Sequence, residues 1–96
     1  MAGIKDYPAI YAHMQELMGR LGEEHPTVMK AFGSLHQAAS ADGELDVVAK
    51  ELIALGIAIA VHCDGCISFH VHDARAAGAS RKAIVETIGV AILMGG

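Results

Sequence analysis

The 96-residue sequence has no tryptophan and contains only two tyrosines and two phenylalanines. Its hydrophobic content is nevertheless 53%, so burial must come from aliphatic side chains and methionine. A chain of this size forms only a modest core, because a large share of its surface stays in contact with solvent. We therefore expect part of the aliphatic surface to be buried between copies of the chain, in a homo-oligomer.

Positive charge and long apolar runs are also scarce. Seven basic residues against eleven acidic ones give a net charge of -4, which does not provide the basic surface that a nucleic acid backbone requires. The longest apolar run, 52–61, is about half of a membrane-spanning helix, and Lys5 and Asp6 stand where a signal peptide has an apolar stretch. These absences predict a soluble, cytoplasmic protein that binds neither nucleic acid nor membrane.

Turn residues divide the chain into five segments of helical length, and no segment shows convincing strand alternation. Pro26 suits a first helical turn, while Gly22 and Gly78 suit helix ends. Asp46 and Ser80 suit the caps of the helices that follow them. The predicted helices cover residues 7–22, 26–39, 47–61, 63–77 and 81–94. We therefore predict an all-α fold of about five helices that forms a single domain over residues 1–96, with the apolar second half of the third helix buried.

The most informative stretch is HCDGCISFHVH, from His62 to His72. Cys63 and Cys66 have a CxxC spacing that permits an internal disulfide, and a position at the start of a helix favours a thiolate over a thiol. At about 100° per residue, the two cysteines and His70 share one stripe, whereas His72 points to roughly the opposite side. His70 is therefore the predicted base that takes or relays the proton of Cys66.

Glu51 is the second candidate, because it begins an otherwise apolar helical run that leads directly to the cysteines. If the third and fourth helices are antiparallel, Glu51 and His70 differ in axial height by only a few ångström. A glutamate side chain and one water molecule can span such a gap. The sequence thus predicts a proton relay from Glu51 through His70 to Cys66.

Other interpretations of the same stretch remain open. In a reducing compartment a cysteine pair is more often catalytic or metal-binding than a structural staple. A zinc site would use both cysteines, His70 and either His62 or His72, but the flanking histidines project away from the stripe, so the helix would have to break. Covalent haem attachment is excluded, because it needs histidine directly after the second cysteine, where Ile67 stands.

Glu51, both cysteines and His70 fall into the pattern E-x11-C-x2-C-x3-H, which resembles the signature of the alkyl hydroperoxidase D-like group within the carboxymuconolactone decarboxylase family. The likeness extends from about Phe32 onward and includes the run A-x-x-A-G-A-S-x-x-x-I-x-E over residues 74–86. The resemblance implies an all-helical fold that assembles as trimers or hexamers. It also implies that Cys66 becomes a sulfenic acid, that Cys63 resolves it to a Cys63–Cys66 disulfide, and that His70 and Glu51 relay protons.

These expectations together describe a thiol-dependent peroxidase that reduces hydrogen peroxide or alkyl hydroperoxides. Its partners would be the peroxide and an external dithiol or protein reductant, with no metal or organic cofactor required. Family members that decarboxylate a lactone lack the CxxC, so decarboxylation is disfavoured. The alternatives are a protein disulfide reductase without peroxidase activity and a non-catalytic, zinc-stabilised or structural oligomeric module. Relatives usually continue beyond MGG into another helix, so the apolar face over 84–93 is expected to need cover from another protomer.

Overall fold

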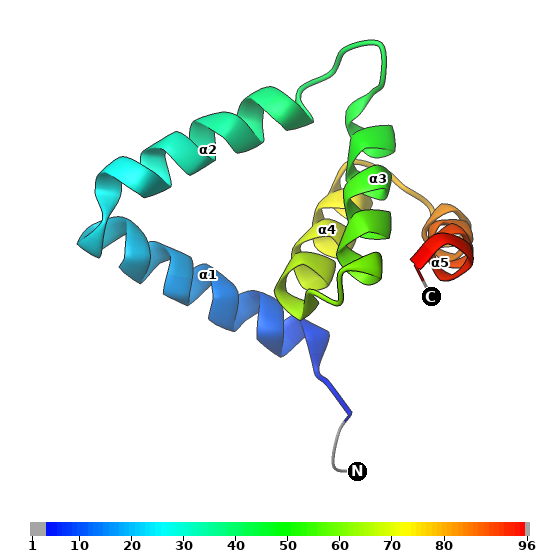
Figure 1. Cartoon of the computed structure of the whole chain (residues 1–96), viewed down its shortest axis with the longest axis horizontal. Coiled ribbons are helices and arrows are strands. Elements are labelled where there is room, and N and C mark those ends of the chain that lie inside the picture. Colours follow the sequence, from blue (N-terminus) through cyan, green and yellow to red (C-terminus); the bar gives the residue numbers. More distant parts are fainter. Residues whose placement is uncertain (1–3, 96) are drawn as a thin grey trace.

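The computed structural model describes residues 4–95, and within them the chain forms five helices and no strand (Figure 1). The prediction of an all-α fold with about five helices is therefore confirmed. The helices are α1 (Tyr7–Glu24), α2 (Pro26–Ser40), α3 (Val47–Ala60), α4 (Asp64–Ala76) and α5 (Arg81–Gly95).

Short polar side chains begin the helices where the sequence predicts them to. The Asp46 carboxylate accepts a hydrogen bond from the Ala49 N–H at 2.8 Å, and the Ser80 hydroxyl accepts one from the Ala83 N–H at 3.0 Å. Such caps satisfy backbone donors that have no partner within the helix. Gly78, after α4, has a φ of 105°, which is readily available only to glycine.

The predicted end of the first helix at Gly22 is wrong, because α1 continues two residues further, to Glu24. The break falls at His25, whose N–H still bonds to the Leu21 carbonyl at 2.7 Å. His25 precedes Pro26, and a residue before proline is pushed out of helical geometry. The proline, rather than the glycine, therefore decides where α1 ends and α2 begins.

Helices α3 and α4 form a hairpin joined by the short turn over 61–63, and α5 packs against α3 (Figure 1). His62 in this turn takes the left-handed φ of 59°, which lets the chain reverse within three residues. The buried apolar side chains all belong to these three helices and are small or aliphatic: Leu55, Ala58, Ala74, Ile84 and Ala91.

Helices α1 and α2 form an arm on the side of the hairpin away from α5 (Figure 1). α1 packs against α4, and α2 returns with little contact to α3. A Cβ atom at Gly65 would lie 3.2 Å from the Met14 Cε, so glycine lets α1 approach α4 closely at this point. Neither arm helix contains a fully buried residue.

The prediction that the apolar second half of α3 is buried is correct for one side of the helix only. Leu55 and Ala58 are buried, whereas Ile57 is 59% exposed, because α4 and α5 leave one side of α3 uncovered. On α5, Ile84 of the predicted apolar face is buried, but Leu93 is 79% exposed. Within the described residues, no helix has the length and apolar character needed to cross a bilayer.

Candidate functional site

The two cysteines lie at the turn from α3 into α4. Cys63 is the N-cap residue of α4, and its sulfur accepts a hydrogen bond from the Cys66 N–H at 3.2 Å. The two sulfurs are at disulfide distance, and the Cα atoms are 5.2 Å apart. Cys63 is half-buried and Cys66 is exposed, so the second cysteine is the more accessible one. Asp64 is the first residue of the helix.

Glu51 and His70 meet directly across the α3–α4 hairpin. The His70 Nδ1 lies 2.8 Å from a carboxylate oxygen, Oε2, of Glu51. The Glu51 side chain is 5% exposed and the His70 ring 21% exposed. The bridging water expected from the axial spacing is therefore not needed. Since the carboxylate accepts from Nδ1–H, the free nitrogen for proton transfer is Nε2.

A cavity of about 510 Å³ connects these groups to the arm. Its polar members are His36, Cys63, Cys66, His70 and Asp73, and its wall is completed by apolar side chains of α1, α2 and α4, among them Met14, Met18, Met29, Phe32 and Phe69. We call this space the dithiol cavity. The fold thus brings three of the four predicted residues, both cysteines and His70, to one cavity. Glu51 does not line this cavity but contacts His70 through its Nδ1.

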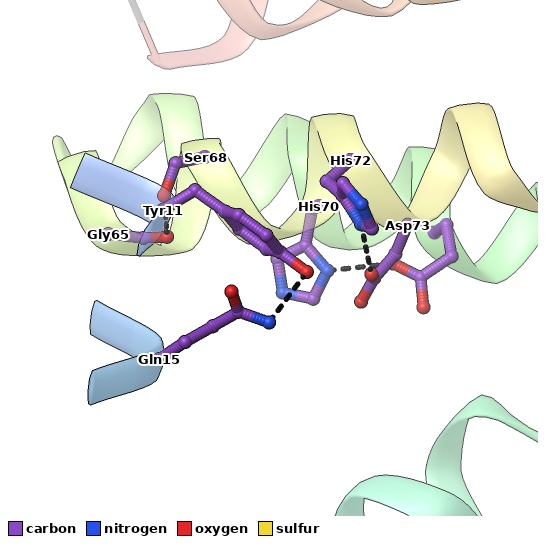
Figure 2. Close-up of polar contacts among 8 residues, drawn as sticks. Tyr11, Gln15, Gly65, Ser68, His70, His72 and Asp73 are labelled. Atoms are coloured by element: carbon purple, nitrogen blue, oxygen red, sulfur yellow. Dashed lines mark hydrogen bonds and ion pairs between the residues drawn. The ribbon is translucent and has the colours of Figure 1, made fainter. Parts of the chain in front are cut away.

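His72 lies outside this arrangement, as the helical periodicity predicts. Its ring stacks on Tyr11 with centroids 4.3 Å apart, and its Nδ1 lies 3.2 Å from the Asp73 carboxylate (Figure 2). Tyr11 also contacts Phe69 edge-on and accepts a hydrogen bond from Gln15. His72 therefore anchors α1 to α4, and a zinc site made of the cysteines, His70 and His72 does not match this geometry.

Asp64, one of the two residues between the cysteines, is held by residues that precede and begin α1, which the sequence did not reveal. The Asp64 carboxylate accepts hydrogen bonds from the Lys5 ammonium at 2.6 Å and the Tyr7 hydroxyl at 3.0 Å. The hydrogen bond from Lys5, followed by that from Tyr7, holds the pKa of Asp64 below its ordinary value. The same contacts raise the pKa values of Lys5 and Tyr7. A separation of 57 or more residues left no local signal for this contact.

A second cluster of polar side chains could not be found from the sequence either. His36 of α2, Glu51 of α3 and Asp73 of α4 each place one potential ligand atom within 4.8 Å of those of the other two. In the sequence, His36 had no evident partner. Figure 2 shows His70 and Asp73 on the same side of the α4 ribbon. The group of His36, Glu51 and Asp73 therefore lies next to the Glu51–His70 pair.

The sequence model of the carboxymuconolactone decarboxylase family matches residues 26–96. The chain belongs to the carboxymuconolactone decarboxylase family. The match covers α2 to α5, and therefore all four predicted site residues, but leaves out α1. The resemblance to the carboxymuconolactone decarboxylase family as a whole is therefore confirmed.

Relatives of this family member come from several bacteria. An uncharacterised protein of Cupriavidus necator is 40% identical over 81% of this chain and 69% of its own length. Uncharacterized protein 4 in the cox locus of Paracoccus denitrificans is 38% identical over 80% of the chain and 69% of its own length. An uncharacterised Haemophilus influenzae protein is 35% identical over 72% of the chain, which spans only 61% of that relative.

A solved structure shows the same fold. The apo crystal structure of a carboxymuconolactone decarboxylase family protein from Legionella pneumophila superposes with a TM-score of 0.89 at 40% sequence identity. The match covers 94% of this chain and 80% of the Legionella chain. The arrangement of the arm, the hairpin and α5 is therefore the arrangement found in an experimentally determined family member.

Proposed function

We propose that this family member is a thiol-dependent peroxidase of the alkyl hydroperoxidase D-like type. The observation that carries the proposal is the position of the Cys63 and Cys66 sulfurs, at disulfide distance beside His70 in the dithiol cavity. A pair placed in this way can pass between dithiol and disulfide with little movement of the backbone. The redox pair, rather than the fold alone, supports oxidoreductase chemistry.

In the first step the Cys66 thiolate attacks one oxygen of a hydroperoxide, ROOH. The O–O bond breaks, an S–O bond forms, and the leaving alkoxide takes a proton, which gives an alcohol and a Cys66 sulfenic acid. Cys66 is assigned this role because it is the more exposed of the two cysteines and stands one helical turn before His70. His70 accepts the thiol proton and returns one to the leaving oxygen.

In the second step the Cys63 thiol attacks the sulfenic sulfur. A disulfide forms, and the hydroxyl leaves as water after taking the proton of Cys63. An external dithiol then reduces the disulfide by thiol–disulfide exchange and becomes oxidised itself. The cycle thus consumes one peroxide and one dithiol, and it yields an alcohol, water and the oxidised reductant.

Glu51 acts through His70 in this scheme. Its buried carboxylate holds the Nδ1–H, fixes the ring orientation and stabilises the imidazolium that forms when Nε2 takes a proton. The four residues proposed for the chemistry are therefore Cys66 as nucleophile, Cys63 as resolving thiol, His70 as base and Glu51 as the positioning residue.

A second candidate function is a protein disulfide reductase that does not use peroxide. The exposure of Cys66 favours it, because a bulky disulfide needs access to the attacking sulfur. Consumption of tert-butyl hydroperoxide with dithiothreitol as reductant distinguishes the two. The peroxidase loses this activity in Cys66→Ser, whereas a reductase consumes no peroxide but reduces small synthetic disulfides.

We also propose that the protein functions as a homo-oligomer. The supporting observation is the exposed aliphatic surface along α3 and α5, which includes Ile53, Ile57, Val90, Ile92 and Leu93. Ile53, Ile57 and Val90 line one open hollow between the two helices, and soluble monomers rarely expose large apolar patches. Other copies of the chain would bury this surface and would complete the modest core of a single chain.

A further inference from the structure

His36, Glu51 and Asp73 come from three different helices and converge at one point. One potential ligand atom from each lies within 4.8 Å of the other two, although the residues are far apart in the sequence. The imidazole is exposed, the Asp73 carboxylate is half-buried and Glu51 is buried. The peroxidase scheme assigns no role to His36 or Asp73, so their convergence needs a separate explanation.

Only one oxygen of the Glu51 carboxylate has a hydrogen-bond partner among the described residues. That oxygen is Oε2, and its partner is His70. Oε1 is therefore left for another group. His36 borders the dithiol cavity, which Asp73 also lines, and it borders a second cavity of about 330 Å³, which Glu51 lines. Glu51 is a nearly buried acid that lines this second cavity together with His36, and a cation can reach its carboxylate from there.

We propose that His36, Glu51 and Asp73 form a binding site for a divalent transition cation of the zinc type. One imidazole nitrogen and two carboxylate oxygens form a three-ligand set that leaves a fourth position for water. The imidazole selects against Mg²⁺ and Ca²⁺, which prefer oxygen ligands alone. The site is distinct from the zinc site considered from the sequence, because it uses neither cysteine.

Binding an ion requires the three ligand atoms to draw slightly closer together. Ligand atoms about 2.1 Å from a tetrahedral ion lie about 3.4 Å from one another, which is less than the 4.8 Å within which these atoms fall. Helix α2 has no buried residue and little contact with α3, so the His36 ring can approach at low cost. A bound ion therefore ties the arm to the hairpin beside the dithiol cavity.

The first experiment titrates Zn²⁺ and Co²⁺ into the full chain with its Cys63–Cys66 disulfide intact, as verified by the absence of free thiols. The thiols then cannot contribute ligands. Calorimetry with Zn²⁺ and the visible absorption of Co²⁺ are expected to show one ion per chain, with no competition from Mg²⁺. His36→Ala and Asp73→Asn should each weaken binding at least about tenfold, since the loss of even an outer hydrogen-bond partner of a ligand costs that much.

The matched control is His13→Ala, which removes an exposed imidazole from α1. It should bind Zn²⁺ like the unaltered protein. The proposal is overturned if the oxidised protein binds less than one ion per chain, or if His36→Ala binds as tightly as His13→Ala.

Amide hydrogen exchange gives a second readout that does not depend on ligand affinity alone. Zn²⁺ should slow exchange in α2 of the unaltered protein and of His13→Ala, but not of His36→Ala. Equal protection in all three proteins would contradict the link between the arm and the hairpin. Neither measurement involves turnover, so the metal site and the peroxidase proposal stand or fall separately.

Discussion

The substitution Glu51→Gln tests the positioning role of the buried carboxylate. Glutamine keeps the size of the side chain and an oxygen that can accept the Nδ1–H of His70, but it removes the negative charge. The hydrogen bond spans 2.8 Å and Glu51 is nearly buried, so solvent does little to screen this charge from the imidazolium.

The expected loss of reaction rate in Glu51→Gln follows from that geometry. A hydrogen bond to a charged group contributes about 1.5–3 kcal/mol, and about 1.4 kcal/mol corresponds to a factor of ten. If the charge of Glu51 acts mainly on the protonated form of His70, the rate of Cys66 oxidation should fall about 10- to 100-fold. The free energy of unfolding should change much less, by about 1 kcal/mol, because the hydrogen bond is weakened rather than left without a partner.

The assay is stopped-flow oxidation of the reduced, metal-free protein by tert-butyl hydroperoxide across the pH range, with circular dichroism as a check on folding. Glu16→Gln is the matched control, because it removes the same charge from an exposed position on α1. A folded Glu51→Gln protein with the rate and pH profile of Glu16→Gln would refute the reasoning and remove Glu51 from the relay.

Four further outcomes are expected. Leu55→Ala should lower the free energy of unfolding by about 2–5 kcal/mol in urea titrations, because Leu55 is 1% exposed in the core. Asp64→Asn should destabilise the protein only where the carboxyl is ionised, because the hydrogen bond from Lys5 is the main cause of the lowered pKa of Asp64 in the folded protein. The difference in the free energy of unfolding between the variant and the unaltered protein is therefore present above pH 3.8 and disappears as the pH falls through that lowered pKa. Ile57→Lys should reduce the oligomer mass in sedimentation equilibrium, since a charge on this exposed apolar face opposes its burial. Cys63→Ser should still react with one peroxide but accumulate a Cys66 sulfenic acid that dimedone traps, and the absence of a dimedone adduct on Cys66 after peroxide would contradict the resolving role of Cys63.

The contact between Glu51 and His70 could be anticipated because a short turn fixes the geometry of a helical hairpin. Once α3 and α4 are antiparallel, counting residues from the turn places the two side chains at similar heights. The prediction erred only in adding a water, because the sequence does not give the distance between the helix axes. Similarly, Asp46 and Ser80 were predictable caps, since capping depends on residues within one helical turn.

The positions of His36 and Lys5 could not be anticipated in this way. The approach of His36 to Glu51 and the contact of Lys5 with Asp64 both depend on where the arm lies against the hairpin. The angle of the arm is set by the break at His25 and by packing between distant segments. The exposure of Ile57 was missed for a related reason. An apolar helix surface indicates burial, but the sequence does not say whether the chain itself or another copy covers it.

The central claim is that Cys63 and Cys66 are a peroxide-driven redox pair. The most direct test is alkylation of free thiols followed by mass spectrometry, on reduced metal-free protein before and after one equivalent of tert-butyl hydroperoxide, with Cys66→Ser in parallel. The account predicts rapid loss of both thiols to a Cys63–Cys66 disulfide, with Cys63 of the variant still alkylated after peroxide. Thiols that stay fully alkylatable in the unaltered protein would contradict it.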